Sequence, residues 1–280
     1  MLELVESIDQ DHLRIMATHF SGTIEKGEGA SFLEVGNHHG NGTISCYDLF
    51  PGLTVWIYNL VYYKKFEVEL TLSENGPIYF CYNVKGEYGH RLGPKGGEKT
   101  VLENQNMIFS GFPGNNVYIS FPTEKKLEIA VIAVDLEKLK ISESLNAKKI
   151  SDGLGTLFRK ASKQLPYLYL GRINTETAKL ASVLFENNDS TLVGQLLTEG
   201  AVLNMLATQL MEFDNADINI GQGTALTKAE LSRITSLEDY IMQNLQEKLT
   251  VKKLSQHYGI SQRKLQLGVK QLYGYTVCLY

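Results

Sequence analysis

The hydrophobic period of the chain changes near residue 136, and this change constrains the fold more than any other sequence feature. Before it, apolar residues recur every second position, and after it they recur every three to four. All six prolines lie in the first 170 residues, where aromatic and β-branched residues also concentrate. The sequence therefore predicts an α+β protein with antiparallel β structure first and helices afterwards.

Five short runs in the first half carry the strand signal. Phe66–Leu70 alternates apolar and charged residues, which is typical of a strand with one wet face. Turn sequences such as 74–77 (Glu-Asn-Gly-Pro) separate the runs. Many short strands at this spacing predict a small barrel or sandwich. The other runs are Thr54–Asn59, Ile78–Val84, Val117–Phe121 and Leu127–Val134.

The second half contains helical patterns. Thr175–Glu186 and Thr191–Phe213 both place apolar residues at helical spacing. The apolar surface of the second is wider than one contact needs, so it fits either a buried core helix or a dimer interface. Lys228–Leu245 is expected to be a helix that braces the end of the chain.

A length of 280 residues favours two domains with a connector. We expect a β domain at 1–135, a helical connector and dimerisation region at 136–213, a linker at 214–227 and a C-terminal module at 228–280. The linker is assigned because its sequence is rich in Asn, Asp and Gly.

Composition narrows the class of protein. Hydrophobic and charged contents of 43% and 21% are ordinary for a globular protein. The N-terminus lacks the basic residues of a signal peptide, and no apolar run reaches the roughly 20 residues of a membrane span, so a cytoplasmic protein is expected. The three cysteines form neither a disulfide framework nor a metal-binding spacing. They are Cys46, Cys81 and Cys278.

The last thirty-two residues, 249–280, are basic on an otherwise acidic chain. They contain five basic residues and no acidic one, whereas the whole chain carries −4, so the first 248 residues carry −9. A local excess of Lys and Arg can replace counterions along a phosphate backbone, which indicates a polyanion-binding surface.

The same segment has the spacing of a helix-turn-helix. Thr250 is a good N-cap for a first helix, Gly259 supplies a left-handed turn residue, and Ser261 can cap a second helix. Gly274 is expected to end that second helix. The inward apolar positions are Val251, Leu254, Ile260, Leu265, Val269 and Leu272.

The outward positions suit the reading of DNA. Arg263 can contact guanine with two hydrogen bonds, and Gln262 or Gln266 can do the same with adenine. The alternative is a solvated cationic face on a helical hairpin. The remaining outward residues, which suit DNA contacts and chiefly phosphate, are Lys252, Lys253, Lys264 and Lys270.

Several motifs in this segment resemble the first helix-turn-helix of the AraC family of bacterial transcription regulators, most of all its PchR-type branch. The resemblance covers about the last 45 residues. It implies a cupin-like N-terminal sensory domain, a homodimer, a small-molecule effector of unknown identity and promoter DNA as partner, with RNA polymerase as a further candidate partner. The motifs are Leu249–Leu254, Tyr258–Ser261, Lys264–Gln266 and Gly268–Gly274, followed by 275–277 ahead of Tyr280.

The segment departs from the family pattern in three respects. Val269 stands where the family has Phe, a loss of core volume that could cost about 1–3 kcal/mol. Leu267 stands where a basic groove contact is common, so no base-reading role is assigned to it. The second module of the family is expected beyond Tyr280, so the 280-residue chain is expected to bind DNA weakly or not at all. The alternative function is a truncated ligand-binding or dimerisation protein that does not bind DNA.

An enzyme is not expected, and neither is a cofactor. A metal-dependent cupin enzyme is the remaining alternative, but His38 and His39 are adjacent and would point to opposite faces of a strand. The glycine-rich sequence 93–97 lacks the ending of a phosphate-binding loop, and no nucleophile elbow is present.

The strand-rich half also contains a candidate effector pocket, because the mouth of a small barrel is a common ligand site. Its expected lining is aromatic, with ordinary core packing as the alternative for each residue. The candidates are Trp56, Tyr58, Tyr79 and Tyr82, with Phe80 between them.

Overall fold

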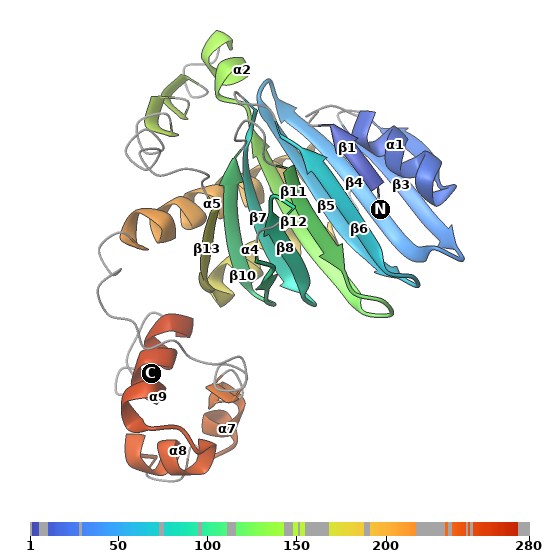
Figure 1. Ribbon diagram of the computed structural model, residues 1–280. Helices are drawn as coiled ribbons and strands as arrows, with labels where there is room; N and C mark the ends of the chain where they lie inside the picture. Colours follow the sequence, from blue (N-terminus) through green and yellow to red (C-terminus); the bar gives the residue numbers. More distant parts are fainter. Residues whose placement is uncertain are drawn as a thin grey trace. The chain divides into compact units, whose positions relative to one another are not determined.

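The computed structural model of the chain contains two compact units, Met1–Gly171 with Glu176–Asp214, and Arg172–Thr175 with Asn215–Tyr280. Figure 1 labels their helices and strands. The residues that the structure describes are 2–5, 11–27, 30–72, 76–94, 97–110, 116–142, 148–150, 152–154, 168–187, 191–216, 233–234, 237–244, 246 and 249–273.

The first unit is built on two sheets. The smaller sheet has the strand order β1-β6-β11-β8-β9, and the larger has the order β13-β10-β7-β12-β5-β4-β3-β2. In the described part of the chain neither sheet closes on itself, so of the expected barrel and sandwich the structure is a sandwich. The small-sheet strands are β1 (Leu2–Val5), β6 (Phe66–Thr71), β8 (Tyr88–Leu92), β9 (Lys99–Val101) and β11 (Asn116–Phe121).

The larger sheet is mostly antiparallel, and each strand run predicted from the sequence is found in one of the two sheets. One of its strands, β13, was not predicted and lies within the region expected to be helical. The strands are β2 (Thr23–Gly27), β3 (Ala30–Asn37), β4 (Gly40–Phe50), β5 (Leu53–Tyr62), β7 (Ile78–Lys85), β10 (Gln105–Ser110), β12 (Lys126–Val134) and β13 (Leu168–Ile173).

The central strands of the larger sheet are buried on both faces, and successive side chains enter two different cores. In β12, Ile129 and Ala133 pack in the core between the sheets, whereas Ile132 and Val134 pack in the core on the opposite face. This explains why β7 and β12 are nearly continuous apolar runs, whereas β6, with one wetter face, alternates.

Helices cover the outer face of the larger sheet (Figure 1). The helix α4 (Thr175–Glu186) has the predicted bounds, and α5 (Leu192–Ala216) extends slightly beyond its predicted end. The short helix α2 (Leu136–Ile141) contributes the buried Leu139. On the other side, α1 (Asp11–Phe20), which was not predicted, buries Leu13 in the core between the sheets.

One end of α5 carries an exposed apolar surface, although the middle of the helix is buried. Val202 and Met205 are fully buried beneath the sheet face. Near the helix N-terminus, however, four apolar side chains are between 53% and 69% exposed. We call them the α5 apolar patch, which consists of Leu192, Val193, Leu196 and Leu197.

A buried polar contact ties the larger sheet to the other end of α5. The Nδ2 atom of Asn106, in β10, donates to Oε2 of Glu212 over 2.5 Å. Gln209, one turn earlier on the helix, donates from Nε2 to the carbonyl oxygen of Cys81 over 3.5 Å. Because Asn106 and Gln209 are both fully buried, these hydrogen bonds fix α5 against β10 and β7.

The C-terminal part of the second unit contains helices. Its helices are α7 (Leu237–Gln243), α8 (Val251–Tyr258) and α9 (Gln262–Tyr273). Tyr240 of α7 stacks on His257 of α8 with ring centroids 4.1 Å apart, so α7 braces α8. The expected helix 228–245 is described only in part, and most of the expected linker 214–227 lies outside the described residues.

Among the described residues, no helix is long and apolar enough to cross a membrane.

Residues in the core between the larger sheet and the helices should contribute more to the free energy of unfolding than exposed residues do. Replacing Phe80, which is fully buried there, by Ala should lower the free energy of unfolding by about 3–5 kcal/mol, because the cavity left behind cannot fully collapse. Replacing Ile141, which is 82% exposed, by Ala should change it by no more than about 0.5 kcal/mol. Urea unfolding of both variants measures this, and equal losses would contradict the assigned core.

Candidate functional site

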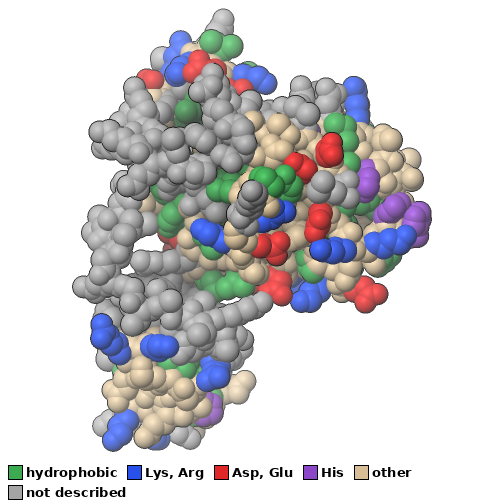
Figure 2. Space-filling view, in the orientation of Figure 1, with side chains coloured by type: hydrophobic (Ala, Val, Ile, Leu, Met, Phe, Trp, Pro, Cys, Tyr) green, Lys and Arg blue, Asp and Glu red, His purple; other side chains and the backbone are tan. Residues whose placement is uncertain are grey.

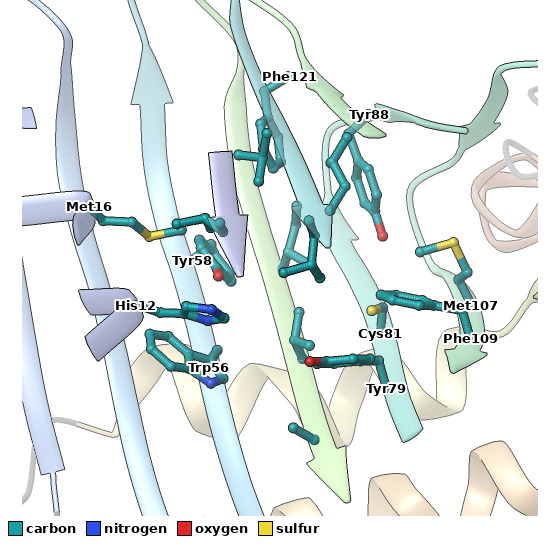
Figure 3. A pocket seen from close by; sticks show the side chains of 17 residues that line it. His12, Met16, Trp56, Tyr58, Tyr79, Cys81, Tyr88, Met107, Phe109 and Phe121 are labelled. Atoms are coloured by element: carbon teal, nitrogen blue, oxygen red, sulfur yellow. The ribbon is translucent and has the colours of Figure 1, made fainter. Parts of the chain in front are cut away.

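A cavity of about 90 Å³ lies between the two sheets of the first unit (Figure 3). Its walls come from strands of both sheets and from α1. The lining is almost entirely apolar or aromatic. It consists of Leu4, His12, Met16, Trp56, Tyr58, Val68, Leu70, Tyr79, Cys81, Tyr88, Met107, Phe109, Ile119, Phe121, Ile129, Val131 and Ala133.

Three of the four aromatic residues predicted for a pocket line this cavity, and one does not. Trp56 and Tyr58 are two positions apart on β5, and Tyr79 faces them from β7. Tyr82 lies three positions beyond Tyr79, so it points to the opposite face and packs beneath the helices. Its assignment to the pocket is therefore wrong, and the two-residue period of the strand already contained the reason. Phe80 points away from the cavity for the same reason.

The sequence did not indicate several other lining residues. His12 and Met16 come from the unpredicted helix α1, and the His12 ring lies 5.8 Å from the Trp56 ring. Tyr88 and Phe109 come from two strands that the sequence analysis did not single out. Cys81 could have been found, because it lies two positions after Tyr79 on the same strand face.

Burial disfavours the charged form of three polar groups of the cavity. It raises the pKa of the Tyr58 hydroxyl above its usual range, and it does the same to the pKa of Tyr88 and of the Cys81 thiol. None of the described lining residues is a carboxylate, a lysine or an arginine. The cavity can therefore hold apolar and aromatic groups, and its polar lining consists of tyrosine hydroxyls, a thiol and the His12 imidazole.

His90 is a buried polar side chain that packs against a residue of the cavity wall but is not itself among the lining residues. It is fully buried, and neither ring nitrogen has a hydrogen-bond partner among the described residues. Burial, helped by the charge of Lys99, lowers its pKa to about 4, so the ring is neutral near pH 7. Its neighbours include Phe109, with ring centroids 5.2 Å apart.

In the described part of the chain, no group of three or more His, Cys, Asp or Glu residues is placed to hold a metal ion. His38 and His39 lie in the turn between β3 and β4, rather than on a strand, and their ring centroids are 4.0 Å apart. The expectation that they point to opposite faces therefore does not apply.

In the second unit, α8 and α9 form a tight helical pair. The Oγ1 atom of Thr250 caps α8 by accepting from the Lys253 backbone N–H over 3.2 Å. Gly259 has φ of 60°, the left-handed conformation that the turn requires. Ser261 accepts from the Lys264 backbone N–H over 3.3 Å and so caps α9. The buried apolar side chains of the pair are Leu254, Ile260, Leu265 and Val269.

The predicted DNA-contacting residues lie mostly on the exposed side of this pair, and Figure 2 shows Lys and Arg side chains on one face of this unit. Arg263 and Gln262, at the start of α9, are exposed. Lys252 and Lys253 are exposed on α8, whereas Lys264 and Gln266 are half-buried. The Lys270 side chain, the Leu267 and Leu272 side chains, Gly274 and Cys278 lie outside the described residues.

A family model decides which class of protein this is. Residues 40–220, which include most of both sheets and all of α4 and α5, match the regulatory protein PchR N-terminal domain. The chain belongs to the PchR-type branch of the AraC-family regulators. The first unit of this regulator thus contains the N-terminal domain of a transcription regulator, as the C-terminal motifs implied.

Solved structures resemble the regulator only distantly. The AraC-like transcriptional activator CuxR has 13% identity and a TM-score of 0.38, with 94% of this chain and 84% of that chain covered. An apo form of ToxT from Vibrio cholerae, with one residue substituted, has 8% identity and a TM-score of 0.40, with 82% and 78% covered. A variant of the oxalate decarboxylase of B. subtilis has 15% identity and a TM-score of 0.26, with 41% and 28% covered. No curated protein matches the sequence.

The buried His90 predicts that the regulator loses stability in mild acid. In the unfolded chain the pKa of the His90 imidazole is about 6.5, whereas in the folded regulator burial lowers this pKa to about 4. The stabilisation is therefore present above about pH 6.5 and is lost as pH falls towards 4, by at most about 1.4 kcal/mol per pH unit. A His90→Leu variant should show a flatter dependence, measured by urea unfolding between these pH values.

His39→Gln provides the control for this measurement. The pKa of His39 is also lowered, chiefly by desolvation, but its side chain is only half-buried, so this variant should flatten the pH dependence much less. A pH dependence in His90→Leu equal to that of the unaltered regulator would contradict the assignment.

Proposed function

We propose that the regulator is a one-component transcription factor, in which the binding of a small molecule controls the binding of promoter DNA. In this proposal the cavity between the sheets binds the effector, the helical region forms a homodimer, and the α8–α9 pair contacts DNA. The observation that carries the proposal is the capped helical pair with its basic exposed side, present in a chain whose other part matches a regulator family. RNA polymerase is a further candidate partner.

The exposed side of the helical pair supports the DNA contact. Arg263 lies at the N-terminal end of α9, the position from which a recognition helix reaches base edges. Gln262 and Gln266 are its candidate partners in base reading. Lys252 and Lys253 lie in the first turn of the preceding helix, where contacts with phosphate are expected. Lys264 and Lys270 are further candidates for phosphate contacts.

This assignment predicts different effects for two substitutions. Lys252→Ala should weaken binding to all sequences alike and reduce the slope of log affinity against log salt by about 0.9, because one phosphate contact is lost. Arg263→Ala should cost about 1–3 kcal/mol on the preferred sequence and relax the preference at one base. Because the 280-residue chain is expected to bind DNA weakly, both substitutions are made in a version extended by the second helix-turn-helix of the family. Binding is measured by fluorescence anisotropy with duplexes selected from a random pool, over a range of salt concentrations.

Lys26→Ala is the matched control, because it removes the same charge from an exposed position of β2 in the other unit. It should change neither the slope nor the preference. If Lys252→Ala and Arg263→Ala produced the same uniform loss, the assignment of Arg263 to base reading would be wrong. If neither differed from the control, the α8–α9 pair would not be the DNA-contacting unit.

The α5 apolar patch supports the homodimer. A monomeric globular protein rarely exposes a contiguous cluster of large apolar side chains, and such clusters commonly mark contacts between proteins. The patch lies on two successive turns of one helix, which suits the self-complementary packing of a two-fold dimer. We therefore place the dimer contact within the proposed helical region 136–213, between the β domain at 1–135 and the linker at 214–227 that leads to the module at 228–280.

Leu196→Glu should shift the regulator towards monomer, because a carboxylate in the patch would have to lose its hydration in the dimer. Ile141→Glu, at an 82% exposed apolar position of α2, should leave the oligomeric state unchanged. Sedimentation velocity at several concentrations measures both. An unaltered dimer in Leu196→Glu would place the dimer contact elsewhere.

A further inference from the structure

A groove of about 470 Å³ lies on the outer face of the larger sheet, beside α4 and α5. Its floor is formed mainly by β3, β4 and β5, and its wall by the end of α4 and the first turns of α5. This volume lies within the roughly 300–1,000 Å³ of small-molecule sites in proteins. The cavity between the sheets, by contrast, measures about 90 Å³, and no residue lines both. The groove is therefore a second candidate ligand site in the first unit.

Hydrogen bonds between α4 and α5 hold the wall of the groove in place. The Nδ2 atom of Asn187, which directly follows α4, donates to the Gly194 carbonyl oxygen over 2.8 Å. It also donates to the Oγ1 atom of Thr198 over 3.0 Å. All three residues line the groove. The two helices are thus fixed to each other at this position, and the wall is preformed.

The groove and the α5 apolar patch lie on opposite sides of the same helical turns. Positions 194, 195, 198 and 199 line the groove, whereas the patch consists of positions 192, 193, 196 and 197. Because successive residues of a helix are rotated by about 100°, these two sets face in opposite directions. A dimer formed through the patch would therefore leave the groove side of α5 outside the contact.

The charged side chains of the groove are carboxylates. Asp48 and Glu199 line it, and none of the described lining residues is a lysine, an arginine or a histidine. The Thr54 hydroxyl donates to Oδ1 of Asp48 over 2.9 Å, which orients this carboxylate. Within the described part of the chain, neither Asp48 nor Glu199 forms an ion pair. Their negative charges are therefore available to a ligand.

The charges around the groove do not reverse its sign. Partners in an antiparallel pair share one face of a sheet, and this places Glu25 and Glu34 on the groove's face at one edge. At the other edge Glu128 shares the face with Lys85 and Lys126, and Lys126 donates to the side chain of a lining residue. These surroundings hold three carboxylates against two lysines, so together with its two lining carboxylates the groove is negative.

Aromatic rings and neutral polar groups complete the lining. Phe32 and Tyr47 lie on adjacent strands with ring centroids 5.8 Å apart in an edge-to-face arrangement, and both are half-buried. The faces of such rings attract organic cations. Amide and hydroxyl groups also line the groove, among them those of Asn59, Gln195 and Thr43. They can hydrogen-bond the polar groups of a hydrophilic molecule.

We propose that the groove binds a hydrophilic organic cation. The carboxylates of Asp48 and Glu199 hold its ammonium group, and its body lies on the rings of Phe32 and Tyr47. The same carboxylates repel an anion of equal size, and a neutral molecule gains no charge pairing from them. This site is additional to the effector cavity, the dimer contact and the DNA contact of the proposed function, and it does not depend on them.

Three compounds of nearly equal size test the inference on the unaltered regulator. Tyramine, tyrosol and 4-hydroxyphenylacetate share a hydroxyphenyl ring on a short chain, which ends in an ammonium, a hydroxyl or a carboxylate group. Isothermal titration calorimetry measures their affinities. We expect tyramine to bind about 3–10-fold more tightly than tyrosol, because partly hydrated carboxylates give only part of the full charge attraction. We expect 4-hydroxyphenylacetate to bind most weakly, and added salt to reduce the ratio of tyramine to tyrosol affinity.

Two double variants assign the preference to the groove. Asp48→Asn with Glu199→Gln keeps the shapes of both side chains but removes their charges, so the ratio of tyramine to tyrosol affinity should fall close to one. Glu3→Gln with Glu137→Gln removes the same charge from exposed positions of β1 and α2 that do not line the groove, and it should leave the ratio unchanged. Because the three-compound comparison is made on the unaltered chain, it stands even if the first double variant does not fold.

Several outcomes would overturn the inference. Equal binding of the three compounds, tightest binding of 4-hydroxyphenylacetate, or binding of none would reject an organic cation as the ligand. An unchanged tyramine preference in the folded Asp48→Asn, Glu199→Gln variant would place the cation outside the groove. An equal loss of preference in both double variants would assign it to the overall charge of the chain and reject the site. The dimer and DNA contacts are tested with other variants, so failure of the proposed function is distinguishable from failure of this inference.

Discussion

The structure of the first unit depends on burying the larger sheet on both faces. A strand sends successive side chains to opposite sides, so β5, β7 and β12 must each supply two apolar faces at once. One face closes against the smaller sheet and forms the aromatic cavity. The other face packs against α4 and α5. The N-terminal end of α5 carries the α5 apolar patch. Burial of the same strands therefore holds the proposed sensory site and the proposed dimer surface in one rigid layer arrangement.

The polar contacts beneath α5 fix the position of the helix on the sheet, in addition to the apolar packing. Met107 lines the cavity, and its neighbour Asn106 hydrogen-bonds Glu212 on the helix. One strand thus has a residue in the cavity wall directly beside a residue that holds α5. Apolar packing alone tolerates sliding between layers, whereas a buried hydrogen bond with defined geometry fixes the helix against the strand.

Much of this could be predicted from the sequence, and the failures have physical causes. Strands such as β6 and helices such as α4 and α5 were found because their hydrophobic period is long and regular enough to be read locally. The caps and turn of the α8–α9 pair were found because they depend on local chemistry. Thr250 and Ser261 each accept a hydrogen bond from the backbone N–H three residues later, and Gly259 supplies the left-handed backbone. The helix α1 and the strand β13 were missed, since each gains its stability from packing that no local pattern records.

The cavity was only half predictable for a related reason. Trp56, Tyr58 and Tyr79 could be guessed as aromatic residues on strands, but Tyr82 shows that richness in aromatic residues does not say which face they occupy. His12 and Tyr88 reach the cavity from elements far apart in the chain, and only the pairing of strands and the docking of α1 bring them there. Sequence alone could not show that the described residues leave His90 without a hydrogen-bond partner, because that is a property of its three-dimensional surroundings.

Because side chains alternate along β5, residues that line the cavity and residues that contact the helices can be substituted independently. Trp56 faces the cavity, while its neighbours Val55 and Ile57 support the helices. Under the proposed sensory role, a substitution at Trp56 or Tyr58 would alter which molecule fits the cavity, whereas the contacts of the helical layer would stay the same. Relatives with this alternation can therefore diverge in the ligand bound at the proposed sensory site while keeping the proposed dimer surface.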